Sequence, residues 1–279
     1  MSIEASLAAC EETVRRADPD RYLTALFAPA ERRPLLFALY AFNHELAHIG
    51  ETAHEPMLAD IRLEWWREAV EGAREGRPRA HDVVRALAEL FARAGPPLEL
   101  FETMIAARRF DVGPRNFADL AALEAYGDAT SGSVMRIAAH LLDEYMHDDA
   151  LFRHAGTAYA LTGILRALPV FAARGKLYLP LALLEANGIA PADIRAGAVI
   201  ARLPAVVGPI VERARAHYDA ARSLPRPGHA FPAVMPAALV PLYAKRLLRK
   251  GGDILRDTSD VPLYRRQMAM LRAAITGHV

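Results

Sequence analysis

The sequence has almost no cysteine and almost no excess of charge of either sign. Cys10 is the single cysteine in 279 residues, which excludes an internal disulfide framework and suits a reducing compartment. We expect it to be a small structural residue. The 34 basic and 33 acidic residues leave a formal net charge of +1. A polyanion-binding signature is therefore missing, and nucleic acid is not expected as a partner.

Long apolar runs are also absent. No stretch approaches the ~20 uninterrupted apolar residues that a transmembrane helix needs. The first 16 residues, MSIEASLAACEETVRR, carry three glutamates and resemble neither a secretory signal nor a convincing transit peptide. We therefore expect a soluble, cytoplasmic protein that is at most peripheral on a membrane.

Helix-forming sequence is abundant. Alanine, leucine, arginine and glutamate dominate, and apolar residues recur at spacings of three and four. No repeat, β-rich segment or domain linker is visible, so we expect one all-α domain over residues 1–279. A proline-rich stretch, 225–236, is expected to be an ordered crossing loop. Helices are predicted at 19–29, 30–50, 56–74, 80–94, 97–111, 117–125, 128–145, 148–168, 180–187, 191–200, 204–223, 236–250 and 260–275.

The predicted helix 30–50 carries a pattern that binds zinc in many metallopeptidases. His44 and His48 are four residues apart, Glu45 follows the first, and His54 stands where one branch of these enzymes has its third ligand. In a continuous helix His54 would lie about 9 Å along the axis from His48. The chain would have to turn back near Gly50, one residue earlier than in those enzymes. Because no strands are predicted beside this helix, a zinc hydrolase is a remote alternative.

Several segments resemble the squalene/phytoene synthase family of all-α isoprenoid synthases. Residues 26–51, LFAPAERRPLLFALYAFNHELAHIGE, are similar to the family's stretch before its first aspartate-rich motif. EAYGDATSGSV, at 124–134, and IRLEWWREAV, at 61–70, match two further helices. LTGILRALPVFAARGKLYLP, at 161–180, is the most specific match. The resemblance spans roughly residues 18–250 and implies a helical bundle around a central cavity.

Members of this family condense two prenyl diphosphates, and two aspartate-rich motifs hold the Mg²⁺ that grips the leaving group. Mg²⁺ prefers carboxylate oxygens, and a departing diphosphate must be neutralised. The resemblance aligns the first motif with residues 47–51, where only Glu51 is acidic. It aligns the aspartates of the second motif with Ala167 and Phe171, around Pro169. A diphosphate-contacting Ser-x-Ser-Phe element becomes residues 19–22, Pro-Asp-Arg-Tyr. The degenerate positions are Ala47, His48, Glu51, Ala167 and Phe171.

A subgroup of the family is more similar still: the phytoene-synthase-like proteins related to NADH dehydrogenase (complex I) assembly factor 6. This resemblance implies a non-catalytic protein without cofactors that assembles or maintains respiratory complex I. We expect an apolar pocket for a prenyl-lipid or quinone-like ligand, or else a plain hydrophobic core. The main alternative is an active prenyltransferase with altered motifs, for which Mg²⁺ would be needed. The residues expected to line the pocket or bind its ligand are Tyr40, His44, Tyr126, Arg166, Arg174, Lys176 and Tyr178.

Overall fold

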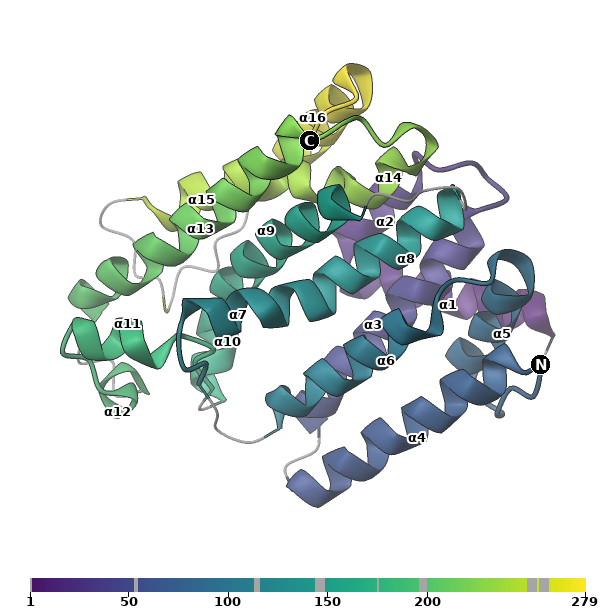
Figure 1. The fold of residues 1–279 in the computed structure, drawn as a ribbon, viewed down its shortest axis with the longest axis horizontal. Coiled ribbons are helices and arrows are strands. Elements are labelled where there is room, and N and C mark those ends of the chain that lie inside the picture. Colours follow the sequence, from purple (N-terminus) through teal and green to yellow (C-terminus); the bar gives the residue numbers. More distant parts are fainter. Residues whose placement is uncertain are drawn as a thin grey trace.

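The protein is a bundle of helices, seen here in a computed structural model (Figure 1). The structure describes residues 2–52, 55–112, 116–143, 149–174, 176–195, 200–249, 255 and 261–279, and within these ranges it contains no strand. The predicted all-α class is confirmed. The α-helices are α1 (Ile3–Ala17), α2 (Pro19–Ala25), α3 (Arg33–Thr52), α4 (Pro56–Arg74), α5 (Asp82–Ala94), α6 (Leu98–Ala107), α7 (Leu120–Gly127), α8 (Ser133–Leu142), α9 (Ala150–Arg166), α10 (Leu168–Ala173), α11 (Leu181–Ala186), α12 (Pro191–Arg195), α13 (Leu203–Ser223), α14 (Phe231–Val234), α15 (Val240–Leu247) and α16 (Leu263–Thr276).

The helix α3 lies in the middle of the bundle (Figure 1). It packs against α1, α5 and α8, and every residue from Leu35 to Phe42 is buried. The ring of Phe42 meets Trp66 of α4 edge-on and Phe101 of α6 at a tilt, with centroids 5.4 and 5.5 Å apart. This all-round burial explains why the segment reads as continuously apolar in the sequence.

Two apolar cores build the molecule. The larger lies around α1, α3, α4, α5 and α8, and the second joins α7, α9, α11 and α13 through residues such as Leu161, Leu179 and Ile210. The helices α9 and α13 run along each other, and α9 also contacts the π-helical turn Asp128–Gly132. A Cβ on Gly156 would lie 2.4 Å from the Cα of Gly132, so this close approach requires glycine.

A second glycine contact joins α3 to the 3₁₀ turn Arg108–Asp111. A Cβ on Gly50 would lie 2.7 Å from the Cβ of Asp111. The helix continues beyond Gly50 to Thr52, so the chain does not turn back at the glycine. This contact brings the end of α3 and Asp111 to the same place.

The structure differs from the sequence-based prediction in several places, and α10, which lies between the predicted helices 148–168 and 180–187, is one of them. The helix α1 was not predicted, although Ser2 caps it by accepting from the backbone N–H of Ala5. The segment predicted as one helix at 128–145 begins with a π-helical turn before α8. The expected loop at 225–236 contains short helical turns, Gly228–Ala230 and α14. Among the described residues no helix has the length and apolarity that a bilayer crossing demands.

Candidate functional site

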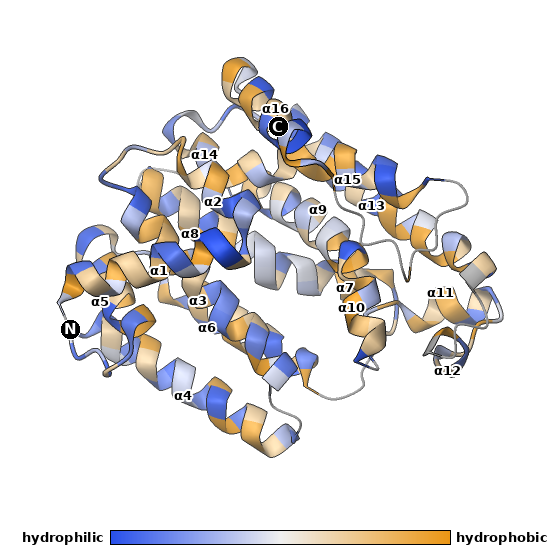
Figure 2. Cartoon of the chain, turned by 180° about the vertical axis from the view of Figure 1, so that it is seen from behind, coloured by the Kyte–Doolittle hydropathy of each residue, from blue (hydrophilic) through white to orange (hydrophobic). Residues whose placement is uncertain are grey.

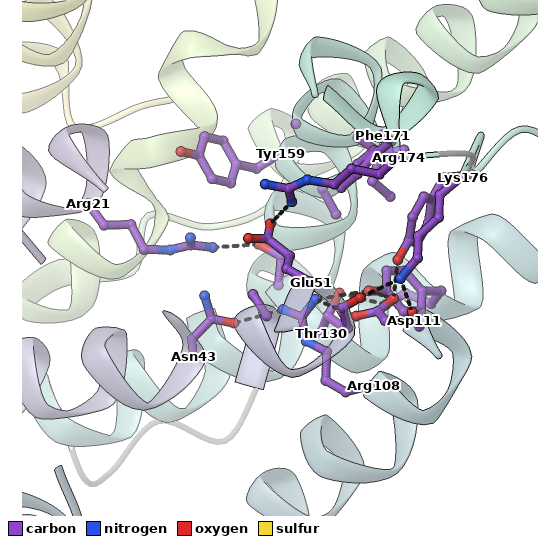
Figure 3. A pocket seen from close by; sticks show the side chains of 18 residues that line it. Arg21, Asn43, Glu51, Arg108, Asp111, Thr130, Tyr159, Phe171, Arg174 and Lys176 are labelled. Atoms are coloured by element: carbon purple, nitrogen blue, oxygen red, sulfur yellow. Dashed lines mark hydrogen bonds and ion pairs between the residues drawn. The ribbon is translucent and has the colours of Figure 1, made fainter. Parts of the chain in front are cut away.

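A cavity opens between α3, α9 and the turn that follows α6, and it encloses a volume of about 210 Å³. Figure 3 shows its polar side chains pointing toward one another from these separate elements. The lining residues are Arg21, Asn43, Ala47, Gly50, Glu51, Arg108, Asp111, Tyr126, Thr130, Ser131, Tyr159, Ala160, Gly163, Ile164, Phe171, Arg174, Lys176 and Tyr178.

The carboxylate of Asp111 organises one wall of the cavity. Its Oδ1 accepts hydrogen bonds from the hydroxyls of Tyr126, at 2.7 Å, and Tyr178, at 2.9 Å. Its Oδ2 accepts from Nη1 of Arg108 at 3.1 Å. Burial raises the pKa of both tyrosine hydroxyls, so they stay protonated and act as donors. Tyr178 has a φ of 51°, a left-handed backbone conformation that is uncommon outside glycine.

Arg108 is the fixed cation of this wall. Burial alone disfavours its charge, but Tyr126 and Asp111 outweigh burial and raise the pKa of Arg108. Nη2 donates to the Oδ1 of Asn43 at 3.2 Å, while the buried Nε has no hydrogen-bond partner. The guanidinium therefore carries a full charge and keeps an unused donor beside the cavity.

Lys176 bridges the two elements that the Gly50 contact brings together. Its Nζ donates to the carbonyl oxygens of Gly50 and Asp111, each at 2.5 Å. Burial lowers the pKa of Lys176. The ammonium thus holds the end of α3 against the turn after α6, and it adds a second cation to the lining.

Glu51 and Arg174 form the outer part of the site. An oxygen of Glu51 lies 2.9 Å from Nη1 of Arg174, and the other lies 3.5 Å from Nε2 of His48. Both Arg174 and His48 are almost half exposed. The Glu51 carboxylate therefore already has basic partners on both oxygens.

Arg21 is the buried cation on the opposite side. It donates to Asp18 at 2.7 Å and to the hydroxyl of Ser131 at 2.9 Å, and it lies 5.0 Å from the ring centroid of Tyr159. The ring of Tyr40 lies beneath the same guanidinium at 5.8 Å. Tyr40 is therefore a support for Arg21 and does not itself line the cavity.

The structure brings together part of the residue set predicted from the sequence. The lining contains the predicted residues Ala47, Glu51, Tyr126, Phe171, Arg174, Lys176 and Tyr178. Ala167, His44 and His48 lie outside the lining. Arg166 also lies outside it, because its guanidinium stacks 3.6 Å from the ring centroid of Tyr243 and pairs with buried Asp20 at 3.5 Å.

Sequence reasoning missed seven polar residues of the lining: Arg21, Asn43, Arg108, Asp111, Thr130, Ser131 and Tyr159. Arg21 falls in the segment aligned with the diphosphate-contacting element of the resembled family, which was a usable signal. Arg108 and Asp111 lie in a short turn between helices. In such a turn the spacing of apolar residues does not show which side chains face the interior.

The charge of the lining favours an anion. Four cations face two carboxylates, and both carboxylates already have basic partners. In the part of the chain that the structure describes, no group of three or more His, Cys, Asp or Glu residues is arranged to hold a metal ion. Arginine forks and a lysine ammonium are the groups that bind phosphate or carboxylate oxygens directly. The cavity can thus take a compact anionic group without a metal.

The two histidines of the zinc-site pattern that the structure describes lie outside the cavity lining. The rings of His44 and His48 lie 4.2 Å apart between centroids, and burial, followed by the neighbouring His48, lowers the pKa of His44. Glu45 lies away from the cavity, in a surface hollow that it shares with Cys10. The third predicted ligand, His54, lies outside the described residues.

Comparisons with known proteins agree with this architecture. Complex I assembly factor 6 of Bos taurus is 27% identical over 252 residues, which cover 89% of this chain and 76% of that protein. Presqualene diphosphate synthase of Rhodopseudomonas palustris is 32% identical over 204 residues, which cover 72% of each chain. The crystal structure of a dehydrosqualene synthase in complex with ligand superposes with a TM-score of 0.80 at 21% identity, covering 98% of this chain and 97% of that one. A sequence profile for squalene/phytoene synthase matches residues 14–267. The chain therefore belongs to the squalene/phytoene synthase family.

Proposed function

We propose that this protein is a non-catalytic member of the family that has lost both Mg²⁺–diphosphate motifs and acts in the assembly or maintenance of respiratory complex I. The observation that carries the proposal is the state of the carboxylates in the cavity. Among the described lining residues they are Glu51 and Asp111, and both are engaged by basic side chains. Similarity to complex I assembly factor 6 over most of the chain supports the same role.

The chemistry of Mg²⁺ binding supports the loss of catalysis. Mg²⁺ needs near-octahedral oxygen coordination and is usually held through carboxylates and substrate phosphates. To join such a site, Glu51 would have to leave Arg174, and Asp111 would have to abandon the buried Arg108. The aligned positions Ala47 and Phe171 face the same cavity with side chains that carry no ligand atom.

The cavity suits a lipid or quinone-like ligand with a compact polar head. Its cations can bind an anionic or carbonyl-bearing head group, and apolar residues such as Ala160, Ile164 and Phe171 complete the wall. A volume of about 210 Å³ is below the usual range for ligand pockets, about 300–1,000 Å³. We therefore expect a head group and part of a chain to enter, rather than two complete prenyl chains.

Two experiments test the proposal. Purified protein incubated with farnesyl or geranylgeranyl diphosphate and Mg²⁺ should yield no squalene, phytoene or presqualene diphosphate. Deletion of the gene in its own organism should lower complex I assembly and activity. Complementation with the native gene serves as the control. Robust turnover would overturn the loss of catalysis, and unaltered complex I in the deletion strain would overturn the assembly role.

A second candidate is a prenyltransferase with altered motifs, favoured by the similarity to presqualene diphosphate synthase and by the carboxylate of Glu51 at the rim. In that case Glu51→Ala should abolish turnover with a prenyl diphosphate. The assembly role predicts instead that this variant restores complex I in the deletion strain.

A further inference from the structure

The last helix, α16, is apolar on its outer side as well as on its inner side. Met270 and Ala273 are buried against the bundle. At about 100° per residue, Tyr264, Met268, Leu271 and Ile275 share the opposite face, at spacings of four, three and four. They are 61%, 63%, 47% and 78% exposed. We call these four residues the outer stripe.

The outer stripe continues onto the neighbouring turn after α2. Leu26 and Phe27 are exposed there and line a groove with Met268 and Leu271. The groove has a volume of about 360 Å³, and no charged side chain lines it. Exposed apolar residues are usually scattered singly, whereas a contiguous patch marks a surface that binds a partner or a membrane.

The charged side chains of α16 itself have one sign. Residues 261–279 contain no aspartate or glutamate and three arginines. Arg266 points inward and pairs with Asp20 at 2.7 Å, while Arg265 and Arg272 are exposed. Helical geometry places these two arginines on the same flank of the outer stripe, two turns apart. Arg226, three residues after the end of α13, donates from Nε to Nε2 of His278 at 3.3 Å, just beyond the C-terminal end of α16.

We propose that α16, with the turn at Leu26 and Phe27, docks onto a lipid surface that carries anionic head groups. A helix with an apolar face and arginines on its flank lies in the plane of a membrane interface, with the guanidinium groups reaching the phosphates. In both views α16 lies at an edge of the molecule, and Figure 2 colours much of it hydrophobic. A flat bilayer can reach such an edge, and the acid-free flank matches a negatively charged surface better than a neutral one.

Vesicle flotation tests this inference with the full chain. The protein should float with phosphatidylcholine vesicles that contain phosphatidylglycerol and should stay unbound with phosphatidylcholine alone. Met268→Gln combined with Leu271→Gln should reduce binding at least about tenfold, since it removes two exposed apolar side chains that would insert into the bilayer. Arg265→Gln combined with Arg272→Gln should weaken binding to anionic vesicles about thirtyfold, at about 1 kcal/mol per arginine.

The matched control is Ile61→Gln on α4, which alters another residue that is 58% exposed, on a helix at the opposite edge (Figure 1). This variant should bind vesicles as the native protein does. The inference is overturned if the native protein ignores anionic vesicles, or if Ile61→Gln weakens binding as much as the double variant does. It is also overturned if the native protein self-associates in light scattering and the double variant alone is monomeric, since the outer stripe would then join two copies. The inference is independent of the proposed function, because flotation requires neither a ligand in the cavity nor complex I.

Discussion

Replacing Asp111 by asparagine should destabilise the protein more than any exposed charge change. The carboxylate is 4% exposed and pairs with Arg108, itself 13% exposed, at 3.1 Å. Asparagine has nearly the same shape but no charge, so the guanidinium is left buried without a counter-ion. Breaking a buried pair in this way costs about 3–5 kcal/mol. Urea unfolding followed by circular dichroism measures the loss directly.

The adjacent arginine supplies a matched control. Asp60 and Arg109 form an ion pair with the same 3.1 Å separation, but their side chains are 43% and 69% exposed. Solvent screens this pair, so Asp60→Asn should cost less than about 1 kcal/mol. If Asp111→Asn lowers the free energy of unfolding no more than Asp60→Asn does, then burial does not determine how strongly the Asp111–Arg108 pair stabilises the protein, and the prediction is refuted.

Three further predictions concern packing, pH and charge. Gly156→Ala should lower the free energy of unfolding by about 3 kcal/mol, because the added methyl group overpacks against the backbone. Gly163→Ala in the same helix has open space around it and should raise the free energy of unfolding by about 0.5–1 kcal/mol. Equal effects of the two variants in urea unfolding would contradict the packing argument. Burial lowers the pKa of His154, so the unfolded chain binds the proton first and stability should fall below about pH 6.5. His154→Gln should flatten that decline in thermal melts taken across this range, and an unchanged slope would refute it. Glu51→Gln should release Arg174 and raise the affinity for inorganic pyrophosphate without Mg²⁺ about fivefold in calorimetry; a requirement for Mg²⁺ would instead favour the enzymatic alternative.

The sequence predicted most helices to within a few residues because their signals are local. Pro56 begins α4 and Arg74 ends it at the predicted bounds, since proline suits the first helical turn. Periodicity failed where the helix type changes, at the π-helical turn Asp128–Gly132. It also missed α1, although Ile3, Leu7, Cys10 and Val14 recur at spacings of four, three and four along the 15 residues of this helix.

The candidate site likewise contains residues that local motifs could identify and residues that they could not. The family, and with it Glu51, Tyr126, Lys176 and Tyr178, could be recognised from motifs carried by contiguous residues. Asp111 could not, because its role depends on partners up to 67 residues away and on a glycine in α3 that admits it.

The sequence by itself therefore determined the helical class and the family, since these are properties of neighbouring residues. Only the tertiary structure decided which charges meet. In the folded protein Arg166 pairs with Asp20 instead of lining the cavity, whereas Arg21 and Arg108 are buried in the lining. One apolar face of α16 is exposed. A helical period specifies which residues share a face. The neighbour that covers that face, or fails to cover it, is chosen by packing between segments distant in the chain.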